Sequence, residues 1–596
     1  MLRSRISVLL ATSVAVLSSG VSTLAQQPRR IDDRALRNAV KEADDWITYG
    51  RDYAETHFSP LKQIDTANIS RLGLAWSWET ESPSGARIEA TPLESNGVLY
   101  GSLGWNVLFA VDARTGKMKW RWDPEISRAR MLKICCGPVN RGVALYKGRV
   151  YAGLLDGRVV ALDQETGKLI WSVKDTPNDD TILTAAIRIV KGKVIVGSSG
   201  AEQAVRGYFS AYDAETGKRV WRFYTVPGDP SKPFEHPELE MAAKTWTGEW
   251  WKMGGGGTVW DAMAYDPDLD LLYVGVGNGG PWDRNLRSPE GGDNLFLASV
   301  LAVKPDTGRM LWYFQETPGD DWDYTSTQPM VLADLTIDGK PRKVLLHAPK
   351  NGFFYVLDRT NGEFISGAKY AKRVTWATGL DAKGRPIEAK GARYGTEPVL
   401  ISPSNGGAHN WQAMAFSPLT GLVYIPGTES SAAYARDPNF VYTPGNQNAG
   451  MSTIQRPRDE QGKVIPGLVP QRPIKEPEGA ENQPAATGGF LVAWDPRTNT
   501  EKWRLPAVGG FMRGGSTLVT AGNILFHNAI AYNAETGEKL WSAEIGGENA
   551  APITYMLDGK QYISVLARGY PNNRLFTLAL DGKEPIPQIP EKPESK

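Results

Sequence analysis

A turn motif that recurs along the chain constrains its fold more than any other feature. Copies of the pattern Ala-x-Asp-x-x-Thr-Gly-x-x-x-Trp, or close variants of it, run through most of the 596 residues. The copies with a terminal tryptophan end at Trp120, Trp171, Trp221, Trp312, Trp503 and Trp541. Weaker copies end at Ile365 or start at Ala264 and Ala415. Such self-similarity indicates that the chain builds one small unit many times.

Each copy predicts two β-strands joined by a tight turn. The glycine of the turn supplies the positive φ that such a turn needs. Alternating apolar segments, such as residues 148–162, precede many copies. Four strands therefore fit into a unit of about 50 residues, which is the size of one β-propeller blade. We expect an all-β protein with the fold of an eight-bladed β-propeller, and seven blades are the alternative. In either case the repeat tryptophans are expected to pack between blades.

The first residues predict a secretory signal peptide over residues 1–25, which leaves residues 26–596 for the propeller. Arg3 and Arg5 precede an apolar stretch over residues 6–17 that is too short to cross a membrane. Later segments contain no long apolar stretch. We therefore expect a periplasmic protein without a transmembrane segment, in a compartment where disulfides persist.

Charge and composition narrow the possible partners. The 67 Lys and Arg side chains nearly balance 66 Asp and Glu side chains, so nothing favours nucleic acid as a partner. Residues 430–484 are rich in Pro, Gly, Asn and charge and show no strand pattern. We expect a long irregular surface insertion there. The segment "GNILFHNAIAYNAETG", which we assign to the last blade, is short and leaves the closure of the ring open.

The two cysteines of the chain, Cys135 and Cys136, are adjacent. A disulfide stabilises a protein mainly by closing a loop of the unfolded chain, and neighbouring residues enclose no loop. Their Cα atoms are about 3.8 Å apart, short of the roughly 4.4–6.8 Å that disulfides prefer. The residues alone favour two buried free thiols.

Several longer stretches resemble the PQQ-dependent alcohol dehydrogenases, and the resemblance covers essentially the whole chain after residue 25. "TPGDDWDYTSTQPMVLAD", "LHAPKNGFFYVLDRTNG", "SNGGAHNWQAMAFSP" and "GGGGTVWDAMAYDP" are similar to the quinoprotein part of quinohaemoprotein alcohol dehydrogenases. The repeat alone is weaker evidence, because non-catalytic propellers carry it too. The resemblance implies PQQ and Ca²⁺ as cofactors, and a functional disulfide between Cys135 and Cys136 that lies against the PQQ.

The resemblance also implies a cofactor site with flat walls and cations, since PQQ is a flat quinone with three carboxylates. Trp260 matches the tryptophan that stacks under the rings, and Arg141 and Lys350 match the cationic partners. Thr184 departs from the Thr-Gly-Ala-Pro of the family, because Ala185, Ala186 and Ile187 follow it in this chain. The implied cofactor-binding residues are Glu89, Cys135, Cys136, Arg141, Thr184, Gly200, Ala201, Trp260, Lys350, Asn410 and Trp411.

Three oxygen donors, Glu202, Asn278 and Asp323, match the metal site of the family. Two carboxylates and an amide oxygen suit a hard divalent cation, which predicts calcium. The lanthanide-using branch of the family carries a second Asp two residues after the catalytic one. That position is Thr325 in this chain, which favours calcium over a lanthanide.

The resemblance assigns the catalytic base to Asp323, which accepts the proton of the alcohol while hydride passes to PQQ and calcium acts as Lewis acid. Asp320 and Asp321 are nearby competitors for the role. The sequence has no Cys-x-x-Cys-His motif for covalent haem, so we expect electrons to pass to a separate cytochrome c.

Two other functions stay open at this point. One is a PQQ dehydrogenase for bulkier polyols, glycols or aldehydes, since the sequence gives no measure of pocket size. The other is a cofactor-free propeller that binds proteins. That second class has no need of a Trp260–Asn278–Asp323 set or of adjacent cysteines.

Overall fold

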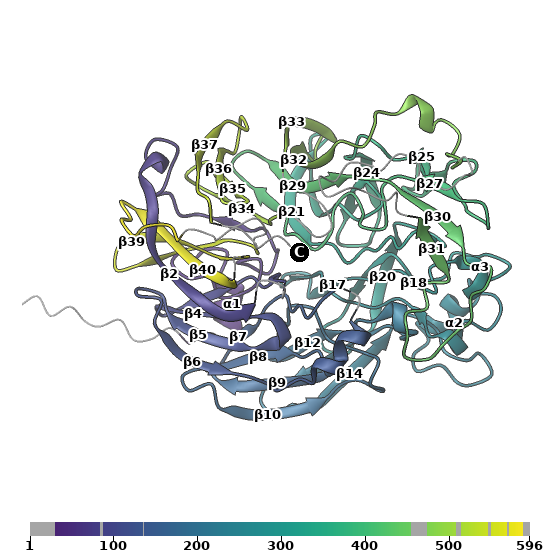
Figure 1. Ribbon diagram of the computed structural model, residues 1–596, viewed down its shortest axis with the longest axis horizontal. Coiled ribbons are helices and arrows are strands. Elements are labelled where there is room, and N and C mark those ends of the chain that lie inside the picture. The colour runs from purple at the N-terminus through teal and green to yellow at the C-terminus, as the bar shows by residue number, and fades with distance from the viewer. Residues whose placement is uncertain are drawn as a thin grey trace, which may run out of the picture.

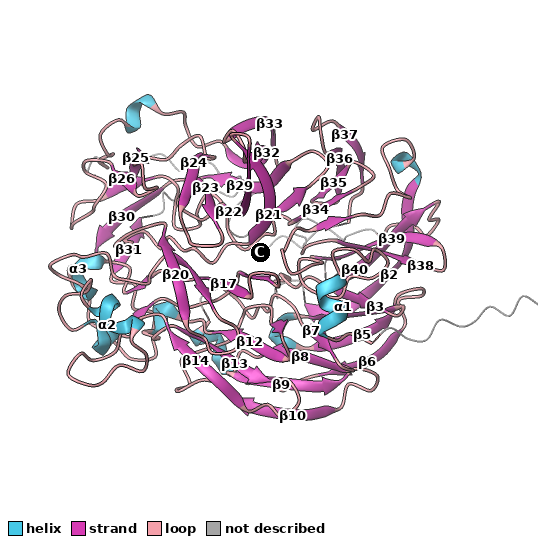
Figure 2. Cartoon of the chain, turned by 180° about the vertical axis from the view of Figure 1, so that it is seen from behind, coloured by secondary structure: helices cyan, strands magenta, loops and turns pink. Residues whose placement is uncertain are grey.

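The computed structural model describes residues 30–83, 87–134, 136–454, 474–507, 514–545, 550–568 and 571–587. These residues form eight large antiparallel sheets, seven with four strands and one with a fifth strand added. The sheets are arranged radially about a common axis (Figure 1), and short helices lie in the connections, several of them at the outer edge of the molecule (cyan in Figure 2). The all-β propeller fold is confirmed. The signal peptide predicted for residues 1–25 lies outside the described residues.

The eight sheets follow one another along the chain. The first four contain β3 (Leu93–Ser95), β4 (Val98–Ser102), β5 (Leu108–Asp112) and β6 (Met118–Trp122); β7 (Ala144–Tyr146), β8 (Arg149–Gly153), β9 (Arg158–Asp163) and β10 (Leu169–Lys174); β11 (Arg188–Val190), β12 (Lys193–Gly197), β13 (Tyr208–Asp213) and β14 (Arg219–Tyr224); and β16 (Met263–Asp266), β17 (Leu271–Gly275), β19 (Ser299–Val303) and β20 (Met310–Gln315). The next four contain β21 (Met330–Ile337), β22 (Lys340–His347), β23 (Phe353–Asp358) and β24 (Phe364–Lys369); β28 (Ala415–Ser417), β29 (Leu422–Glu429), β32 (Gly488–Asp495) and β33 (Thr500–Pro506); β34 (Thr517–Thr520), β35 (Ile524–His527), β36 (Ile530–Asn533) and β37 (Lys539–Ser542), joined by β1 (Phe58–Ser59); and β38 (Ile553–Leu557), β39 (Lys560–Ala567), β40 (Asn572–Leu580) and β2 (Leu72–Pro83).

Smaller elements lie in the connections. The small sheets are β15 (Gly255–Gly256) with β18 (Gly279–Gly280), β25 (Ala377–Leu380) with β26 (Pro386–Glu388), and β27 (Val399–Ile401) with β30 (Ala432–Arg436) and β31 (Met451–Ile454). The α-helices are α1 (Asp33–Asn38), α2 (Glu238–Ala243) and α3 (Arg284–Arg287). The 3-10 turns are Ile69–Arg71, Gly104–Asn106, Arg128–Lys133, Ala201–Gln203, Trp250–Met253 and Ala480–Asn482.

The repeat motif forms the turn between the third and fourth strands of a sheet. In one copy, Asp163 Oδ1 accepts hydrogen bonds from the N–H and the hydroxyl of Thr166, at 2.8 and 2.7 Å. Gly167 follows at a φ of 70°. Trp120 of the preceding sheet packs on this glycine and donates from its indole N–H to the Gln164 carbonyl at 3.0 Å. The tryptophans therefore join neighbouring sheets, as their repetition predicts.

The ring is closed by two distant parts of the chain. The last sheet takes its fourth strand, β2, from the N-terminal side, where β2 pairs antiparallel with β40 from Leu72↔Leu580 onward. The prediction that "GNILFHNAIAYNAETG" belongs to the last blade is wrong. That segment forms β35 and β36 of the preceding sheet, and β38–β40 follow it. The closing strand carries no full copy of the motif, so the repeat did not reveal it.

An N-terminal segment, residues 31–57, crosses the inner strands of all eight sheets. Backbone carbonyls of this segment, and the side chain of Asp33, accept hydrogen bonds from the sheets. The donors lie in the first strand of a sheet or in the turn after it. Trp46 also forms a β-bridge with Glu94 in β3. The donors are the N–H groups of Lys147, Gly192, Tyr265, Leu332, Phe416, Val519 and Met556. Lys147 and Gly192 lie in turns between first and second strands. This segment therefore closes the end of the axis to which those turns belong.

The predicted irregular insertion at residues 430–484 contains strands, so that prediction is wrong in part. β30 and β31 lie within it and pair with each other, and β30 also pairs with β27. Their small residues, such as Ala432 and Ala433, gave no alternating pattern, because the sheet is short and its strands come from separate stretches. Residues 455–473 lie outside the described residues.

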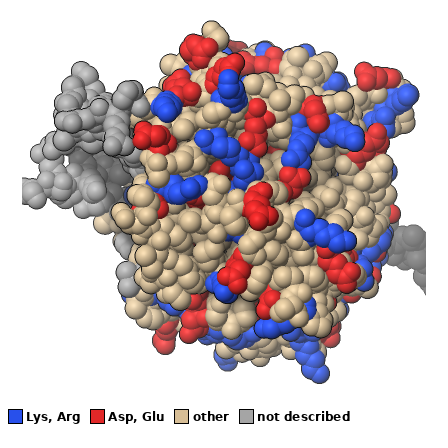
Figure 3. Space-filling view, turned by 90° about the vertical axis from the view of Figure 1, so that its right-hand side faces the viewer, with Lys and Arg blue, Asp and Glu red and all other residues tan. Residues whose placement is uncertain are grey.

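Charged side chains of both signs are interspersed on the face shown in Figure 3, without a large area of one sign. This agrees with the balance of acidic and basic residues in the sequence. Among the described residues, no helix has the length and apolar character needed to span a membrane.

Candidate active site

One pocket collects nearly all the residues that the sequence singled out. It is lined by Glu89, Ile134, Cys136, Gly137, Val139, Arg141, Ile182, Thr184, Ser199, Gly200, Glu202, Gln203, Thr258, Trp260, Asn278, Asp323, Lys350, Asn410 and Trp411. These residues lie in connections from the fourth strand of one sheet to the first of the next, or from a second strand to a third. In an up-and-down sheet both kinds of connection lie at the same face, opposite the turns that contact the N-terminal segment.

Two predicted residues fall outside this set. Ala201 is buried in the 3-10 turn beside the pocket and is not among the residues that line it. Cys135 lies outside the described residues. Cys136 lines the pocket, is half-buried and has no disulfide partner among the described residues. The predicted disulfide between the two cysteines therefore stays a prediction.

A run of glycines at residues 254–257, just before Trp260, packs its backbone against that of Asn278–Gly280. All four have a φ between 72° and 81°, a region that side chains disfavour. A Cβ on Gly256 would lie 2.5 Å from the carbonyl oxygen of Asn278. Gly257 instead donates its N–H to that oxygen at 2.8 Å. The two backbones approach closely only because the run has no side chains.

The turn Ala201–Gln203 carries Glu202 to the same place. It begins after Gly200, whose φ is 108°. Asn278 Nδ2 lies 3.5 Å from Glu202 Oε1, at the limit of a hydrogen bond, and donates to the Gly279 carbonyl at 3.0 Å. Neither contact uses the Asn278 Oδ1 atom. Glu202 and Asn278 are thus brought together as the metal prediction requires.

Arg141 lines the pocket beside Trp260. Its Nη2 lies 2.7 Å from Glu89 Oε2, and its Nη1 donates to Thr184 Oγ1 at 3.1 Å and to the Trp260 carbonyl at 3.0 Å. The guanidinium carbon lies 4.7 Å from the centre of the Trp260 ring. Thr184 also bonds Ser199 Oγ at 2.7 Å, so Thr184 holds a place in this network although the residues that follow it depart from the family pattern.

Asp323 and Lys350 form a buried ion pair. Lys350 Nζ donates to Asp323 Oδ2 and to the Asp323 carbonyl, both at 2.9 Å. Asp323 has a φ of 64°, which lies in the left-handed region that only a few residue types tolerate. Burial raises the pKa of Asp323 well above its usual range; Lys350 opposes this shift, and the nearby Glu202 carboxylate adds to it. A carboxyl group with a raised pKa is suited to accept a proton.

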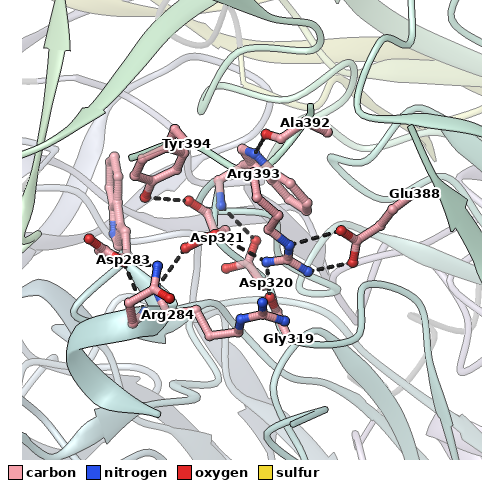
Figure 4. A network of polar contacts seen from close by, with 12 residues as sticks. Asp283, Arg284, Gly319, Asp320, Asp321, Glu388, Ala392, Arg393 and Tyr394 are labelled. Atoms are coloured by element: carbon pink, nitrogen blue, oxygen red, sulfur yellow. Dashed lines mark hydrogen bonds and ion pairs between the residues drawn. The ribbon is translucent and has the colours of Figure 1, made fainter. Parts of the chain in front are cut away.

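The competing carboxylates Asp320 and Asp321 serve the structure around Asp323. Asp320 Oδ1 accepts the N–H groups of Trp322 and Tyr324, at 3.1 and 2.9 Å. Asp321 accepts from Arg284 N and pairs with Arg393 at 3.2 Å, and Tyr394 donates to its carbonyl (Figure 4). Neither carboxylate lines the pocket. The structure therefore places Asp323, and not its neighbours, where substrate chemistry is possible.

Arg393 fixes this loop from a distant part of the chain. Besides Asp321 it pairs with Glu388 and donates to the Gly319 carbonyl at 2.6 Å (Figure 4). Its guanidinium carbon lies 4.5 Å from the ring of Trp322. These supporting residues were not predicted from the sequence, because they carry no motif and act only through the loop.

Asn410 and Trp411 also line the pocket. Asn410 donates to the Gly406 carbonyl at 2.7 Å and accepts from the Trp411 N–H at 2.8 Å. Gly407 allows Lys350 to pack closely, because a Cβ there would lie 2.4 Å from Lys350 Cγ. Trp411 and Trp260 give the pocket two large flat surfaces.

The pocket fits PQQ and a hard cation on its own chemistry. Four side chains in its lining have buried polar atoms without a hydrogen-bond partner among the described residues: Glu89 Oε2, Arg141 Nε, both amide atoms of Gln203 and the hydroxyl of Thr258. Glu89 and Arg141 form an ion pair with each other, whereas Gln203 and Thr258 have no charged partner in the part of the chain that the structure describes. Buried polar groups are normally paired, so these atoms point to a polar ligand. Neither residue was predicted from the sequence, although each lies within two positions of a predicted one. Indole walls, an arginine, a lysine and oxygen donors match a flat molecule with carboxylates and a metal.

The described residues contain no group of three or more His, Cys, Asp and Glu side chains arranged to hold a metal ion. The candidate calcium site depends on the amide of Asn278 as its third donor. Carboxylates and carbonyl oxygens are the donors that calcium prefers.

The fold and this pocket define a class: a β-propeller enzyme that binds a flat, anionic cofactor at one end of the axis. The family described as "Glucose/ethanol/alcohol dehydrogenase, beta-propeller domain" of the PQQ type matches residues 46–372 and 386–563. The chain is similar to quinohemoprotein alcohol dehydrogenase ADH IIB of Pseudomonas putida, with 49% identity over 97% of this chain and 82% of that protein.

Two further relatives agree. The 1-butanol dehydrogenase (cytochrome c) of Thauera butanivorans is 41% identical over 92% of this chain and 80% of that protein. The crystal structure of quinohemoprotein alcohol dehydrogenase from Comamonas testosteroni superposes with a TM-score of 0.86 at 45% identity, covering 94% of this chain and 84% of that one. The chain belongs to the PQQ-dependent alcohol dehydrogenases. This membership excludes the alternative of a cofactor-free binding propeller.

Proposed function

We propose that this protein is a periplasmic alcohol dehydrogenase that uses PQQ and calcium and passes electrons to a separate cytochrome c. The observation that carries the proposal is the meeting of Trp260, Arg141, Lys350 and Asp323 in one pocket, although they come from four different connections of the propeller. When bound, PQQ supplies the quinone that takes up the electrons of the alcohol.

Asp323 is the proposed general base. It accepts the hydroxyl proton of the alcohol at a carboxylate oxygen, and the raised pKa that burial gives it favours this transfer. Lys350 holds the carboxylate in place through its 2.9 Å bond to Oδ2. Glu202, Asn278 and Asp323 together hold calcium, whose charge offsets the repulsion between the two carboxylates.

The remaining lining residues hold and orient the cofactor. Arg141 binds a carboxylate group, for which its planar guanidinium is suited. Trp260 would stack under the rings, with the proposed Cys135–Cys136 disulfide on the opposite face, and Trp411 would add a further contact. Glu89, Thr184, Gly200 and Asn410 complete the proposed contacts, whereas Ala201, which does not line the pocket, belongs to the 3-10 turn that carries Glu202.

The proposed location and the proposed electron acceptor rest on different observations. The location follows from the signal peptide expected over residues 1–25. The acceptor is supported by the relative of Thauera butanivorans, whose name includes cytochrome c.

A panel of substrates with a dye as electron acceptor tests the proposal. The protein supplied with PQQ and calcium is expected to oxidise simple alcohols with a higher kcat/KM than glycols, polyols or aldehydes of similar size. A clear preference for polyols or aldehydes would favour the bulkier-substrate alternative. Turnover of none of these compounds would contradict the proposed activity.

A further inference from the structure

A chain of buried charges leads from the pocket to the N-terminal segment, and the proposed reaction does not use it. Arg141 lines the pocket, and Asp261 Oδ2 lies 3.5 Å from its Nε. Beyond Asp261, Arg188 donates to both carboxylate oxygens of Glu55 at 2.7 and 3.1 Å. The four side chains are each 6% exposed or less. Glu55 belongs to the segment that closes the opposite end of the axis.

The Arg141 guanidinium already has two carboxylate neighbours. Glu89 Oε2 lies 2.7 Å from Nη2, and Asp261 Oδ2 lies 3.5 Å from Nε. A ligand carboxylate that binds Arg141 adds a third negative charge to the same buried region. Unbalanced buried charge is costly, and a nearby acid reduces this cost when it takes up a proton.

The geometry identifies Asp261 as the acid with the least support for its charge. Its Oδ2 has no hydrogen-bond partner among the described residues, and 3.5 Å is too long for a strong one. Glu55 accepts two hydrogen bonds from Arg188. Glu89 Oε2 also has no hydrogen-bond partner among the described residues, but its ion pair with Arg141 is 2.7 Å long, 0.8 Å shorter than that of Asp261. The titratable and charged groups that face Asp261 are Glu55, Glu89, Arg141, Arg188 and Tyr49.

We propose that Asp261 binds a proton when an anionic cofactor binds to Arg141, so that cofactor binding depends on pH. Asp261 acts in this way through Arg141 and is a positioning residue. The proposal rests on the proposed function in taking PQQ as the cofactor. Burial raises the pKa of Asp261 to about 7, against the opposing charges of Arg141 and Arg188, with Glu89 adding to the rise. Burial also raises the pKa of Glu55 to about 7 and the pKa of Glu89 above its usual range, which makes these two carboxylates the alternative proton acceptors.

The sign of the effect follows from linkage. A third anion raises the pKa of Asp261 further, so the complex holds more protons than the free protein above about pH 7. PQQ affinity then falls as pH rises, by up to about tenfold per pH unit between the two pKa values. In Asp261→Asn the side chain is neutral at every pH, so this dependence disappears.

The full chain is produced without PQQ. The test is a calorimetric titration in which PQQ is added to this protein at saturating calcium and pH 8. Two buffers with different ionisation enthalpies give the number of protons taken up. The wild type is expected to take up about one proton more than Asp261→Asn, and only the variant is expected to bind equally well at pH 7 and pH 9. Asp266→Asn is the matched control, because Asp266 is a buried carboxylate in β16, five residues after Asp261, bonded to Arg359 at 2.7 Å and absent from the pocket lining. It is expected to behave like the wild type.

Equal proton uptake in the wild type and in Asp261→Asn would overturn the proposal. Uptake that survives in Asp261→Asn and is lost in Glu55→Gln would assign the proton to Glu55 and overturn it as well. If Asp261→Asn does not fold, a wild-type affinity that does not change between pH 7 and pH 9 would still contradict the proposal. Absence of PQQ binding in every protein, wild type included, would contradict the proposed function instead.

Discussion

Asp323 is the residue on which the proposed chemistry depends most. Asp323→Asn is expected to lower kcat by about 10²–10⁴-fold, because the amide keeps the shape and the contact to Lys350 but cannot accept the substrate proton. Dye-linked turnover at saturating PQQ and calcium, with a thermal melt to check folding, measures this. Asp321→Asn is the control, since Asp321 bonds Arg284 and Arg393 and does not line the pocket. It is expected to lose thermal stability and keep its turnover. Near wild-type turnover in Asp323→Asn would show that another group is the base.

The adjacent cysteines give a prediction in which stability and activity separate. Cys135→Ala/Cys136→Ala is expected to melt close to the wild type, because a bond between neighbours closes no loop of the unfolded chain. Its PQQ-supported turnover is expected to fall, because Cys136 lines the pocket. Thermal melts and turnover at saturating PQQ measure both. A large loss of stability with normal kinetics would mean that the pair has only a structural role.

Thr325 tests the choice of metal. With PQQ present, the wild type is expected to turn over faster with calcium than with lanthanum, because Glu202 and Asp323 supply two negative charges. Thr325→Asp adds a third carboxylate two residues after Asp323 and is expected to shift the preference toward lanthanum. The hydroxyl that it replaces is buried and bonded to Gln328 and Thr327, so Thr325→Asn is the control for the lost bonds. Higher wild-type activity with lanthanum would reverse the assignment.

At the level of residues, the sequence predicted the site through its resemblance to a family. Trp260, Asn278 and Asp323 each lie in a stretch that matches a family motif, and all three line the pocket. Asp261 follows Trp260 directly but was missed, because its importance comes from Arg141 and Arg188, which are distant in the chain. The roles of Asp320 and Asp321 also needed the structure, since three aspartates within four residues look alike in a sequence.

The repeated turn determines how neighbouring sheets fit. Gly167→Ala is expected to destabilise the protein strongly, because the glycine has a φ of 70° and a Cβ would lie 2.7 Å from the Trp120 ring. Backbone strain alone costs about 1–2 kcal/mol, and the clash adds about 1–3 kcal/mol. Gly148→Ala separates the two effects, because Gly148 has a φ of 76° with open space around its Cβ.

Thermal melts at one scan rate measure the two glycine variants. Gly167→Ala is expected to melt several degrees below Gly148→Ala, and Gly148→Ala slightly below the wild type. Equal melting temperatures for the two variants would mean that contact with the tryptophan adds nothing to the cost of the strained backbone.

The elements that the sequence predicted well are those with local signals. The Asp-x-x-Thr-Gly turns predict the strands on either side of them from a few residues, as in the turn that contains Asp163 and Gly167. β2 and the strands β30 and β31 were not anticipated, because their partners are distant in the chain and their side chains show no alternation of their own. The hydrogen bonds that the backbone carbonyls of residues 31–57 accept could not be predicted from the sequence either, because every residue type has a backbone carbonyl.

For the whole molecule, the two ends of the axis have different tasks. Residues 31–57 contact the first strand of all eight sheets, or the turn after it, and close one end. The connections at the other end are thereby held in register and carry the pocket. Because lining residues come from most of the sheets, the pocket forms only when the ring is complete. This explains how side chains as distant in sequence as Glu89 and Trp411 share one site.

The most direct test of the central claim uses protein produced without PQQ. Its turnover of an alcohol is measured after addition of PQQ, of calcium, of both and of neither. The pocket has cations and indole walls for PQQ and oxygen donors for calcium. The protein is therefore expected to be active only when both are supplied, and NAD is not expected to replace PQQ. NAD-linked turnover without PQQ, or full activity with neither addition, would contradict this account.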